Sequence, residues 1–228
     1  MKKNKKMYFY ESIASEFDSI VKMYDTNKRL EVVYKQLLPE DISGKKLLDA
    51  GCGTGWFSGG AAERGASVTS MDLGEGLLNE VKKKCKSKTV VGSIEKMPFP
   101  DASFDIVVTS EVIEHIPHQI LAFKELSRVL KPGGTLILTT PNKFWYWSVV
   151  IANKLNLRPY QGLENWLSWD ELTRGLEHVE FKVEKQLGVH ALPFTVKSLH
   201  PILDMLHAFN KPLAPYMINM AIRCQKKK

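Results

Sequence analysis

The sequence has few cysteines, no long apolar run and no signal-like start. Its three cysteines, Cys52, Cys85 and Cys224, are odd in number and far apart, which excludes a disulfide framework, and they lack metal-ligand spacing. We therefore expect reduced thiols in a cytoplasmic protein. The most apolar stretch, residues 144–152, is too short to span a bilayer. No apolar segment follows the basic residues 1–6, so no signal peptide is expected.

A basic folded face is also lacking, although the formal net charge is +7. Seven lysines lie in the terminal segments 2–6 and 226–228, and without them the body of the chain is near neutral. A nucleic-acid-binding protein carries its positive charge on a folded face, so we expect no nucleic-acid partner. The simpler interpretation of these lysines is that they belong to solvated, frayed chain ends. Lysines near an anionic membrane contribute about 1 kcal/mol each, so peripheral membrane contact stays open as an alternative.

What the sequence does contain is a glycine-rich turn between an apolar strand and a helix. Residues 48–55 read L-D-A-G-C-G-T-G, with Asp49 two residues before the first glycine. Glycines permit positive φ and let a ligand reach backbone N–H groups. The dinucleotide fingerprint G-x-G-x-x-G would need its third glycine where Trp56 stands, which disfavours a nicotinamide dehydrogenase. The acid favours a ligand with a positive end, such as S-adenosylmethionine.

Strands alternate with helices through most of the chain. We expect strands at residues 46–48, 68–71, 89–91, 106–109, 135–139, 181–188 and 216–224. We expect helices at residues 57–64, 77–85, 119–130, 168–177 and 197–209. This alternation predicts a parallel sheet with helices on both faces, which binds ligands at the carboxyl ends of its strands. Asp49, Asp72, Ser93 and Ser110 all lie at such ends.

Asp72 is the strongest single candidate among these. It lies 23 residues after Asp49, near the interval at which a carboxylate meets a ribose in nucleotide-binding folds. Two hydroxyls can donate to one carboxylate in a charge-assisted pair. An acid at a strand end without a ligand is the alternative interpretation.

Five segments, taken in order, resemble the class I S-adenosylmethionine-dependent methyltransferases that act on small molecules. These segments are residues 48–55, 71–72, 97–105, 111–116 and 130–134. The resemblance implies a Rossmann-like α/β fold. Its seven-stranded sheet is mostly parallel with the last strand antiparallel, and helices cover both faces.

The resemblance also assigns parts of the donor to these residues. It implies that the turn at 51–55 holds the methionine part, Asp72 the ribose and Ser93-Ile94 the adenine, while Ser110 lines the sulfur end. The family often has an aspartate at Ser93, so a serine there predicts weaker donor binding. The candidate donor-binding residues are Arg29, Asp49, Gly51, Cys52, Gly53, Asp72, Leu73, Ser93, Ile94 and Ser110.

Within the family, the chain looks most similar to ubiquinone-biosynthesis O-methyltransferases. Residues 27–30 resemble a segment N-P-x-R-L whose arginine reaches the donor carboxylate, although here the proline is missing and the spacing is one residue shorter. Arg29 is carried over on that likeness. Residues 140–142 and 188–190 also look similar.

Glu111, Glu114 and His115 are the candidates for chemistry on the acceptor. A phenol has a pKa near 10, so having its phenolate ready at neutral pH costs about 4 kcal/mol. If helical, the spacing i, i+3, i+4 puts all three side chains on one face. They could hold a divalent metal, as the resemblance implies, or His115 could act alone as a general base. In a third interpretation Glu111 and His115 only brace the turn. The metal is not favoured; Glu111 and His115 are the predicted catalytic residues.

Residues 143–152 form the least generic segment, with four adjacent aromatic side chains. One interpretation is a helix packed partly on the body. The others are an apolar lid over a lipophilic acceptor, or a face resting at a membrane interface.

The 228 residues, 44% of them apolar, suit a single domain with a buried core. We expect a helical cap at residues 7–38, a donor-binding core at 45–140, and a substrate-covering helix with C-terminal strands at 141–228.

The predicted function is methyl transfer from S-adenosylmethionine, giving S-adenosylhomocysteine, to a small lipophilic hydroxyl compound. A sugar, lipid headgroup or nitrogen nucleophile is the alternative acceptor. A module that binds the donor without turnover and an NAD-dependent dehydrogenase are the alternatives of another class. The oligomeric state stays open.

Overall fold

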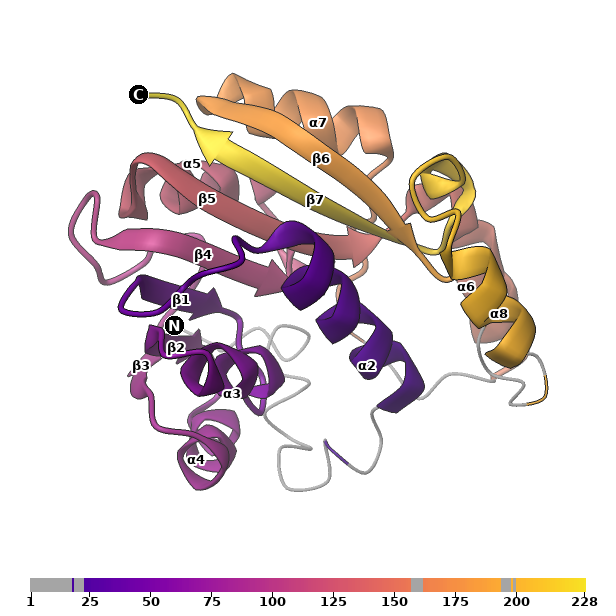
Figure 1. Ribbon diagram of the computed structural model, residues 1–228. Helices are drawn as coiled ribbons and strands as arrows, with labels where there is room; N and C mark the ends of the chain where they lie inside the picture. The colour runs from indigo at the N-terminus through magenta and orange to yellow at the C-terminus, as the bar shows by residue number, and fades with distance from the viewer. Residues whose placement is uncertain (1–17, 19–22, 157–161, 194–197, 199) are drawn as a thin grey trace.

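A computed structural model describes residues 18, 23–156, 162–193, 198 and 200–228. Seven strands form one sheet in the order β3-β2-β1-β4-β5-β7-β6 (Figure 1). The strands are β1 (Lys46–Ala50), β2 (Ser67–Asp72), β3 (Lys88–Val91), β4 (Phe104–Ser110), β5 (Leu130–Pro141), β6 (Phe181–Val189) and β7 (Asn219–Lys226). β7 runs antiparallel to both its neighbours, and the other pairings are parallel. The predicted fold class is confirmed.

Helices cover both faces of this sheet (Figure 1). One face carries α2 (Met23–Val32), the π-helical turn η2 (Val33–Leu37) and α3 (Trp56–Glu63), and the other carries α5 (Gln119–Val129) and α7 (Trp169–His178). The remaining helices are α4 (Glu75–Lys84), α6 (Tyr146–Lys154) and α8 (His200–His207). Short 3₁₀ turns are η3 (Ile113–His115), η4 (Lys143–Trp145) and η6 (Ala214–Tyr216). Among the described residues, no helix combines the length and apolarity needed to cross a bilayer.

Side-chain alternation along the strands builds a core on each face. In β1, Leu47 packs with α2 and α3, whereas Leu48 packs on the α5 and α7 face. Successive side chains of a strand point to opposite faces, so both sides of a central strand read as apolar. The same alternation turns Asp49 toward α3, the face of Leu47.

The capping signal in the sequence placed the start of α7 correctly. The capping box at Ser168 is present, with Ser168 Oγ accepting from the Glu171 N–H and Glu171 accepting from the Ser168 N–H, and α7 begins at Trp169 as expected. The helical pattern in residues 7–20 lies outside the described residues, except for Asp18. The pattern in residues 30–38 is the end of α2 with η2.

Two expected strand starts and one expectation about the C-terminal tail were wrong. β5 begins at Leu130 rather than at 135, because Leu130 already pairs with Phe104 and the left-handed Gly133 takes up the slip in register before Thr135 pairs with Ile106. β7 begins at Asn219 rather than at 216, because Pro215 lies in a 3₁₀ turn. Lys226 is not part of a frayed tail. It ends β7, and its Nζ donates to two carbonyl oxygens at the end of α5.

The glycines offer a direct test of the turn after β1. Gly51 has φ +78°, and a Cβ there would lie 2.4 Å from the Val112 side chain, whereas Gly44 has φ +69° with nothing within 4 Å. We expect Gly44→Ala to lower the free energy of unfolding by about 1–2 kcal/mol through its left-handed backbone alone. Gly51→Ala should cost roughly 1–3 kcal/mol more because of overpacking. Urea unfolding measures both, and equal losses would contradict the tight contact with Val112.

Candidate functional site

The glycine turn after β1 is tied to the end of β2. The N–H groups of Gly51 and Cys52 both donate to the Met71 carbonyl oxygen, at 2.7 and 3.0 Å. Gly53 N–H donates to Asp72 Oδ2 at 2.9 Å. All three glycines of the turn have positive φ, as expected: Gly51, Gly53 and Gly55. The turn is thus held in a conformation that favours glycine.

Asp72 holds its own loop as well as the glycine turn. Its Oδ1 accepts from the Gly74 N–H at 3.0 Å, so the two carboxylate oxygens bind the backbone on either side. These charge-assisted bonds fix the carboxyl group at the carboxyl edge of the sheet, where it was predicted to lie. Leu73, the next residue, is half-buried.

Asp49 lies on the α3 face of the sheet. Its Oδ2 accepts from Ser58 Oγ at 2.6 Å, and Ser58 Oγ lies 2.6 Å from Ser70 Oγ. Burial raises the pKa of Asp49 to about 7 against the Ser58 hydrogen bond, and the charge of Asp72 adds to the increase. A cation near this carboxyl would favour its ionised form. Its predicted contact with the donor stays a prediction.

The expected adenine end of the site follows β3. Ser93 Oγ accepts from the Glu95 N–H at 3.2 Å, which fixes the turn, and Ile94 is buried in the core. Cys52 packs against Leu78 and Val81 of α4. Cys52 follows β1 and Ser93 follows β3, with β2 between the two strands.

Trp56, the residue that departs from the dinucleotide fingerprint, belongs to a polar cluster. Trp56 Nε1 and Thr54 Oγ1 both donate to Asp18 Oδ1, at 3.1 and 2.6 Å. Lys84 of α4 forms an ion pair with Asp18, and its Nζ lies 4.5 Å from the centroid of the Trp56 ring. Sequence reasoning missed Asp18 because it lies 36 residues from its partner Thr54.

Arg29 of α2 reaches the end of β4, and its predicted contact with the donor stays a prediction. Its Nη1 donates to Ser110 Oγ at 3.0 Å, and its Nε and Nη2 donate to Asp25 Oδ2 at 3.1 and 2.8 Å. Burial disfavours the charge on Asp25, but Arg29 and His190 outweigh it and lower the Asp25 pKa to about 2. Two predicted donor-binding residues, Arg29 and Ser110, are therefore in direct contact.

Glu111 has a left-handed backbone, φ +57°, directly after β4. Its Oε1 accepts from Thr139 Oγ1 at 2.9 Å and its Oε2 from Asn219 Nδ2 at 2.8 Å. Burial and then the charge of Glu114 raise the pKa of Glu111 to about 8. A bulky residue held at positive φ stores strain of roughly 1–3 kcal/mol, which the bonds to β5 and β7 offset.

Glu114 and His115 lie in the 3₁₀ turn η3. His115 Nδ1 lies 2.8 Å from the Leu163 carbonyl oxygen, which can only accept, so Nδ1 carries the proton. Its Nε2 lies 3.7 Å from Glu114 Oε1, and Thr140 Oγ1 donates to the other oxygen of Glu114 at 3.1 Å. Burial raises the pKa of Glu114 to about 7.

The helix that would have put these three side chains on one face is not present. Only Ile113–His115 form a helical turn, and the left-handed Glu111 lies before it with its carboxyl bound to β5 and β7. Within the described part of the chain, no group of three or more His, Cys, Asp or Glu side chains could hold a metal ion.

His190 is a site residue that the sequence named only as part of a loose likeness. It follows β6, is 3% exposed, and its Nε2 lies 3.0 Å from Asp25 Oδ1. The two residues are 165 positions apart, so no local pattern could have paired them.

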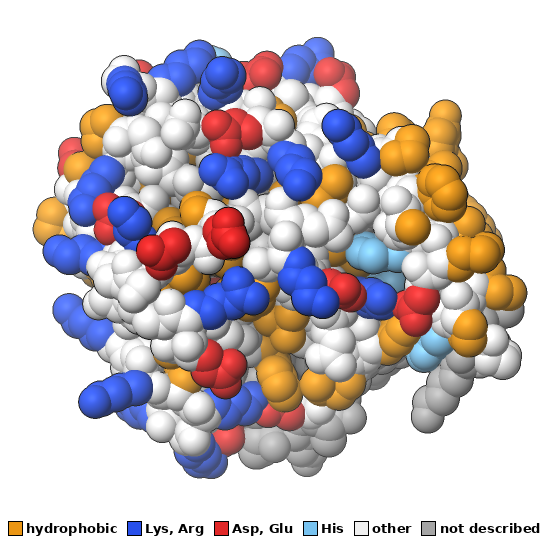
Figure 2. Space-filling view, in the orientation of Figure 1, with side chains coloured by type: hydrophobic (Ala, Val, Ile, Leu, Met, Phe, Trp, Pro, Cys, Tyr) orange, Lys and Arg blue, Asp and Glu red, His pale blue; other side chains and the backbone are white. Residues whose placement is uncertain are grey.

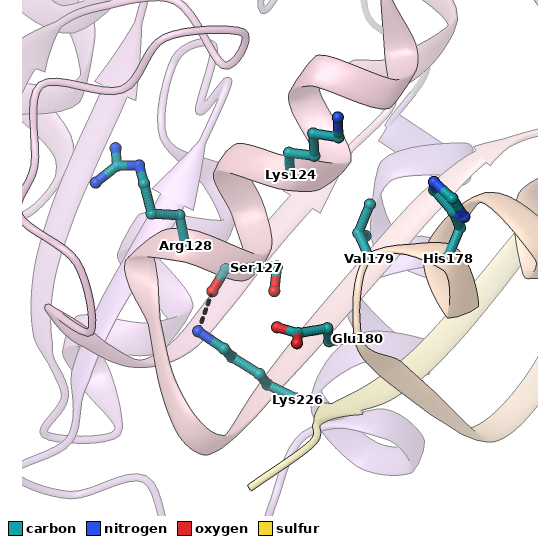
Figure 3. A pocket seen from close by; sticks show the side chains of 7 residues that line it. All are labelled: Lys124, Ser127, Arg128, His178, Val179, Glu180 and Lys226. Atoms are coloured by element: carbon teal, nitrogen blue, oxygen red, sulfur yellow. Dashed lines mark hydrogen bonds between the residues drawn. The ribbon is translucent and has the colours of Figure 1, made fainter.

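A surface hollow of about 350 Å³ lies at the opposite edge of the sheet (Figure 3). Two of its charged side chains already have partners: Lys226 donates to carbonyl oxygens at the end of α5, and Arg128 binds Glu125 and Asp101. Ligands of parallel sheets bind at the carboxyl edge, so this hollow is not part of the candidate site.

The sequence of this chain is similar to those of known proteins. A family model described as a methyltransferase domain matches residues 48–138. The chain is 38% identical over 134 residues to a malonyl-[acyl-carrier protein] O-methyltransferase of Serratia marcescens, covering 57% of this chain and 52% of that protein. It is 31% identical over 169 residues to a ubiquinone biosynthesis O-methyltransferase of Marinobacter nauticus, covering 68% of this chain and 71% of that protein. The chain spans 52% and 71% of the length of these two relatives.

A solved structure agrees on the fold. The crystal structure of an S-adenosylmethionine-dependent methyltransferase of Thermotoga maritima, a possible histamine N-methyltransferase, matches with a TM-score of 0.73 at 20% identity. The match covers 97% of this chain and 100% of that chain, and it shows the fold alone. The sequence relatives decide the family: the chain belongs to the S-adenosylmethionine-dependent methyltransferases.

Proposed function

We propose that this chain transfers a methyl group from S-adenosylmethionine to a small lipophilic acceptor that bears a hydroxyl group. The observation that carries the proposal is the setting of His115. Leu163 fixes one ring nitrogen, while the other, basic nitrogen lies beside Glu114 at the end of β4. The same strand end carries Ser110, which Arg29 contacts.

The residues at the carboxyl edge fit this donor. Asp72, fixed by two backbone N–H groups, is the proposed partner of the ribose hydroxyls. The charge of Arg29 suits the donor's carboxylate, and the turn from Gly51 to Gly53 allows close approach to the methionine part. Asp49, whose pKa is raised to about 7, would gain charge beside a cationic ligand. Ser93 and Ile94 are the proposed adenine contacts.

The bound donor supplies a methyl group already activated by its sulfonium. The chain's own tasks are therefore to align the acceptor, to exclude water and to hold the acceptor's proton. His115 suits the last task, because its Nδ1–H is bound to Leu163 and its basic Nε2 can take a proton from a hydroxyl. Glu114 beside it favours the protonated ring.

Glu111 is better explained as a brace than as the base. Thr139 and Asn219 donate to its two carboxyl oxygens, and it joins three strand ends. The arrangement also favours a lone histidine base over the metal alternative, because the three predicted ligands do not share a helical face.

An exposed apolar face favours a lipophilic acceptor over a sugar, a lipid headgroup or a nitrogen nucleophile. Figure 2 shows apolar side chains gathered at the end of the molecule that Figure 1 labels α6 and α8. The exposed members of this face are Phe144, Trp147, Val150, Ile151, Leu155, Ile202, Met205, Phe209 and Tyr216. α6 packs on the body through Val149, which is buried, as expected for a partly packed helix.

The chemistry of this face suits an anionic lipid surface. Aromatic side chains are enriched where proteins meet the membrane interface. The exposed cations Lys154 and Lys211 flank the face, while Asp204 of α8 is neutralised by Lys28. We propose that the face rests on anionic lipid, from which a lipophilic acceptor reaches the site.

Donor binding tests the family assignment on this chain. Asp72→Asn keeps the size of the side chain but removes its charge, so we expect it to weaken S-adenosylhomocysteine binding about tenfold or more, since a hydrogen bond to a charged group contributes about 1.5–3 kcal/mol. Titration calorimetry measures the affinity. Asp101→Asn, an exposed acid paired with Arg128, is the matched control. Unchanged affinity in Asp72→Asn would exclude the ribose assignment.

The proposed base is tested by acceptors of different acidity. His115→Ala should lower kcat roughly 100- to 10,000-fold with an ordinary lipophilic phenol, the usual contribution of a general base. The loss should shrink with a phenol that is already ionised at neutral pH. His118→Ala, an exposed histidine nearby, should have little effect. Equal losses with both phenols would show that His115 does not remove the proton, and no turnover of any phenol, lipid or amine by the unmodified chain would favour a non-catalytic module.

The apolar face is tested on lipid vesicles. Replacing Trp147 and Ile151 by alanine should lower co-sedimentation with anionic vesicles several-fold, because about 25 cal/mol is lost for each Å² of apolar surface removed from the contact. Val91→Ala removes an equally exposed apolar side chain at β3, far from the face, and is the control. Absence of binding by the unmodified chain, or equal binding to neutral vesicles, would refute the anionic-lipid surface.

A further inference from the structure

His190 occupies a backbone conformation that a residue of its size rarely adopts. It lies directly after β6 with φ +60°, and only 3% of it is exposed. Its carbonyl oxygen accepts from the Ile218 N–H at 2.9 Å. A non-glycine residue at such a φ costs roughly 1–2 kcal/mol, so the surrounding contacts must hold the ring in this one place.

The ring is held against Asp25 of α2. His190 Nε2 lies 3.0 Å from Asp25 Oδ1, and the charged carboxylate accepts, so Nε2 is the donor. The other oxygen, Oδ2, binds the guanidinium of Arg29 through two nitrogens. Asp25 is therefore fixed from both sides, by a residue after β6 and by one on its own helix.

Arg29 in turn contacts the end of β4. Its third nitrogen, Nη1, donates to Ser110 Oγ at 3.0 Å, and Ser110 Oγ lies 2.7 Å from Thr139 Oγ1. An ion pair within one helix ties the two side chains to each other but not to another element of the fold. A second bond to Asp25 from another element adds that tie.

We infer that His190 is a positioning residue for donor binding: by donating to Asp25 it fixes the Arg29 guanidinium at the end of β4, facing the donor's carboxylate. This inference rests on the proposed function, in which Arg29 binds that carboxylate. His190 itself does not touch the reacting atoms.

Docking of α2 does not depend on this bond. Val32 and Val33 are buried in the core beneath the helix, and Lys28 pairs with Asp204 of α8 at 2.9 Å. Loss of the His190 donor should therefore leave the helix in place and change the aim of Arg29. That distinction makes the inference testable apart from folding.

The experiment compares two ligands that differ in the carboxylate. S-adenosylhomocysteine carries the amino-acid group, and 5′-methylthioadenosine lacks it. His190→Phe keeps a ring but has no donor, and we expect it to weaken S-adenosylhomocysteine binding about tenfold, as the loss of a charged hydrogen bond predicts. Binding of 5′-methylthioadenosine should not change. His190→Gln, which restores an N–H donor, should recover most of the affinity.

Steady-state kinetics with the donor supply a second readout, and a control variant accompanies them. His190→Phe should raise the KM for the donor and leave kcat at saturating donor within about twofold. His200→Phe is the matched control. His200 belongs to α8, and its ring stacks on Tyr24 of α2, the helix of Asp25 and Arg29, with ring centroids 3.7 Å apart. Should His190→Phe fail to fold, Asp25→Asn tests the same link and should show the same selective loss.

Two results would overturn the inference: unchanged S-adenosylhomocysteine affinity in a folded His190→Phe variant (or in Asp25→Asn, if His190→Phe does not fold), or an equal loss for both ligands. Arg29→Met separates this failure from that of the proposed function. If Arg29→Met weakens S-adenosylhomocysteine binding while the His190 variants do not, only the positioning role is wrong. If Arg29→Met has no effect, or the unmodified chain binds no S-adenosylhomocysteine, the proposed donor site itself is wrong, and the inference with it.

Discussion

The carboxylate of Asp72 is the contact on which the candidate donor site depends. It ends β2 and binds the backbone N–H groups of Gly53 and Gly74. A glycine-rich turn has much conformational freedom to lose, so it needs strong bonds to hold one shape. Charge-assisted bonds from a strand end supply them, and the Met71 carbonyl adds two more. The turn is thereby held by the sheet itself rather than by a flexible neighbour.

The charged residues around Asp25 and Glu111 follow a different principle, in which buried charges share partners. Asp25 stays ionised because Arg29 and His190 both face it, while Glu111 and Glu114 have pKa values raised to about 8 and 7. A charge removed from water is costly unless it is paired and hydrogen-bonded. The network therefore behaves as a unit, and left-handed residues lie near both its ends, Glu111 and His190. Strain of this kind persists where the surroundings over-determine a conformation, as they do at functional sites.

The exposed apolar face lies outside the candidate site. The site lies at the carboxyl edge of the central strands, whereas α6, α8 and η6 form the end of the molecule beyond β5 and β6 (Figure 1). Phe144 contacts Tyr216, with ring centroids 5.8 Å apart, and Trp145 Nε1 donates to the Tyr216 carbonyl oxygen. The aromatic segment is thus anchored to η6 while its outer side chains meet solvent. The exposed apolar face is thus separate from the buried charged side chains around Asp25 and Glu111.

The sequence alone determined the sheet, the glycine turn, and the place of Asp72 and Ser110 at strand ends, because apolar periodicity and glycine or capping signals act over a few residues. It also indicated the family. Only the tertiary structure decided which side chains meet across the chain. Asp25 meets His190 from 165 positions away, and Glu111 turns left-handed to meet Thr139 and Asn219 instead of joining a helix with His115. Those outcomes depend on the order of strands in the sheet and on the burial of every charge together, which no local pattern encodes.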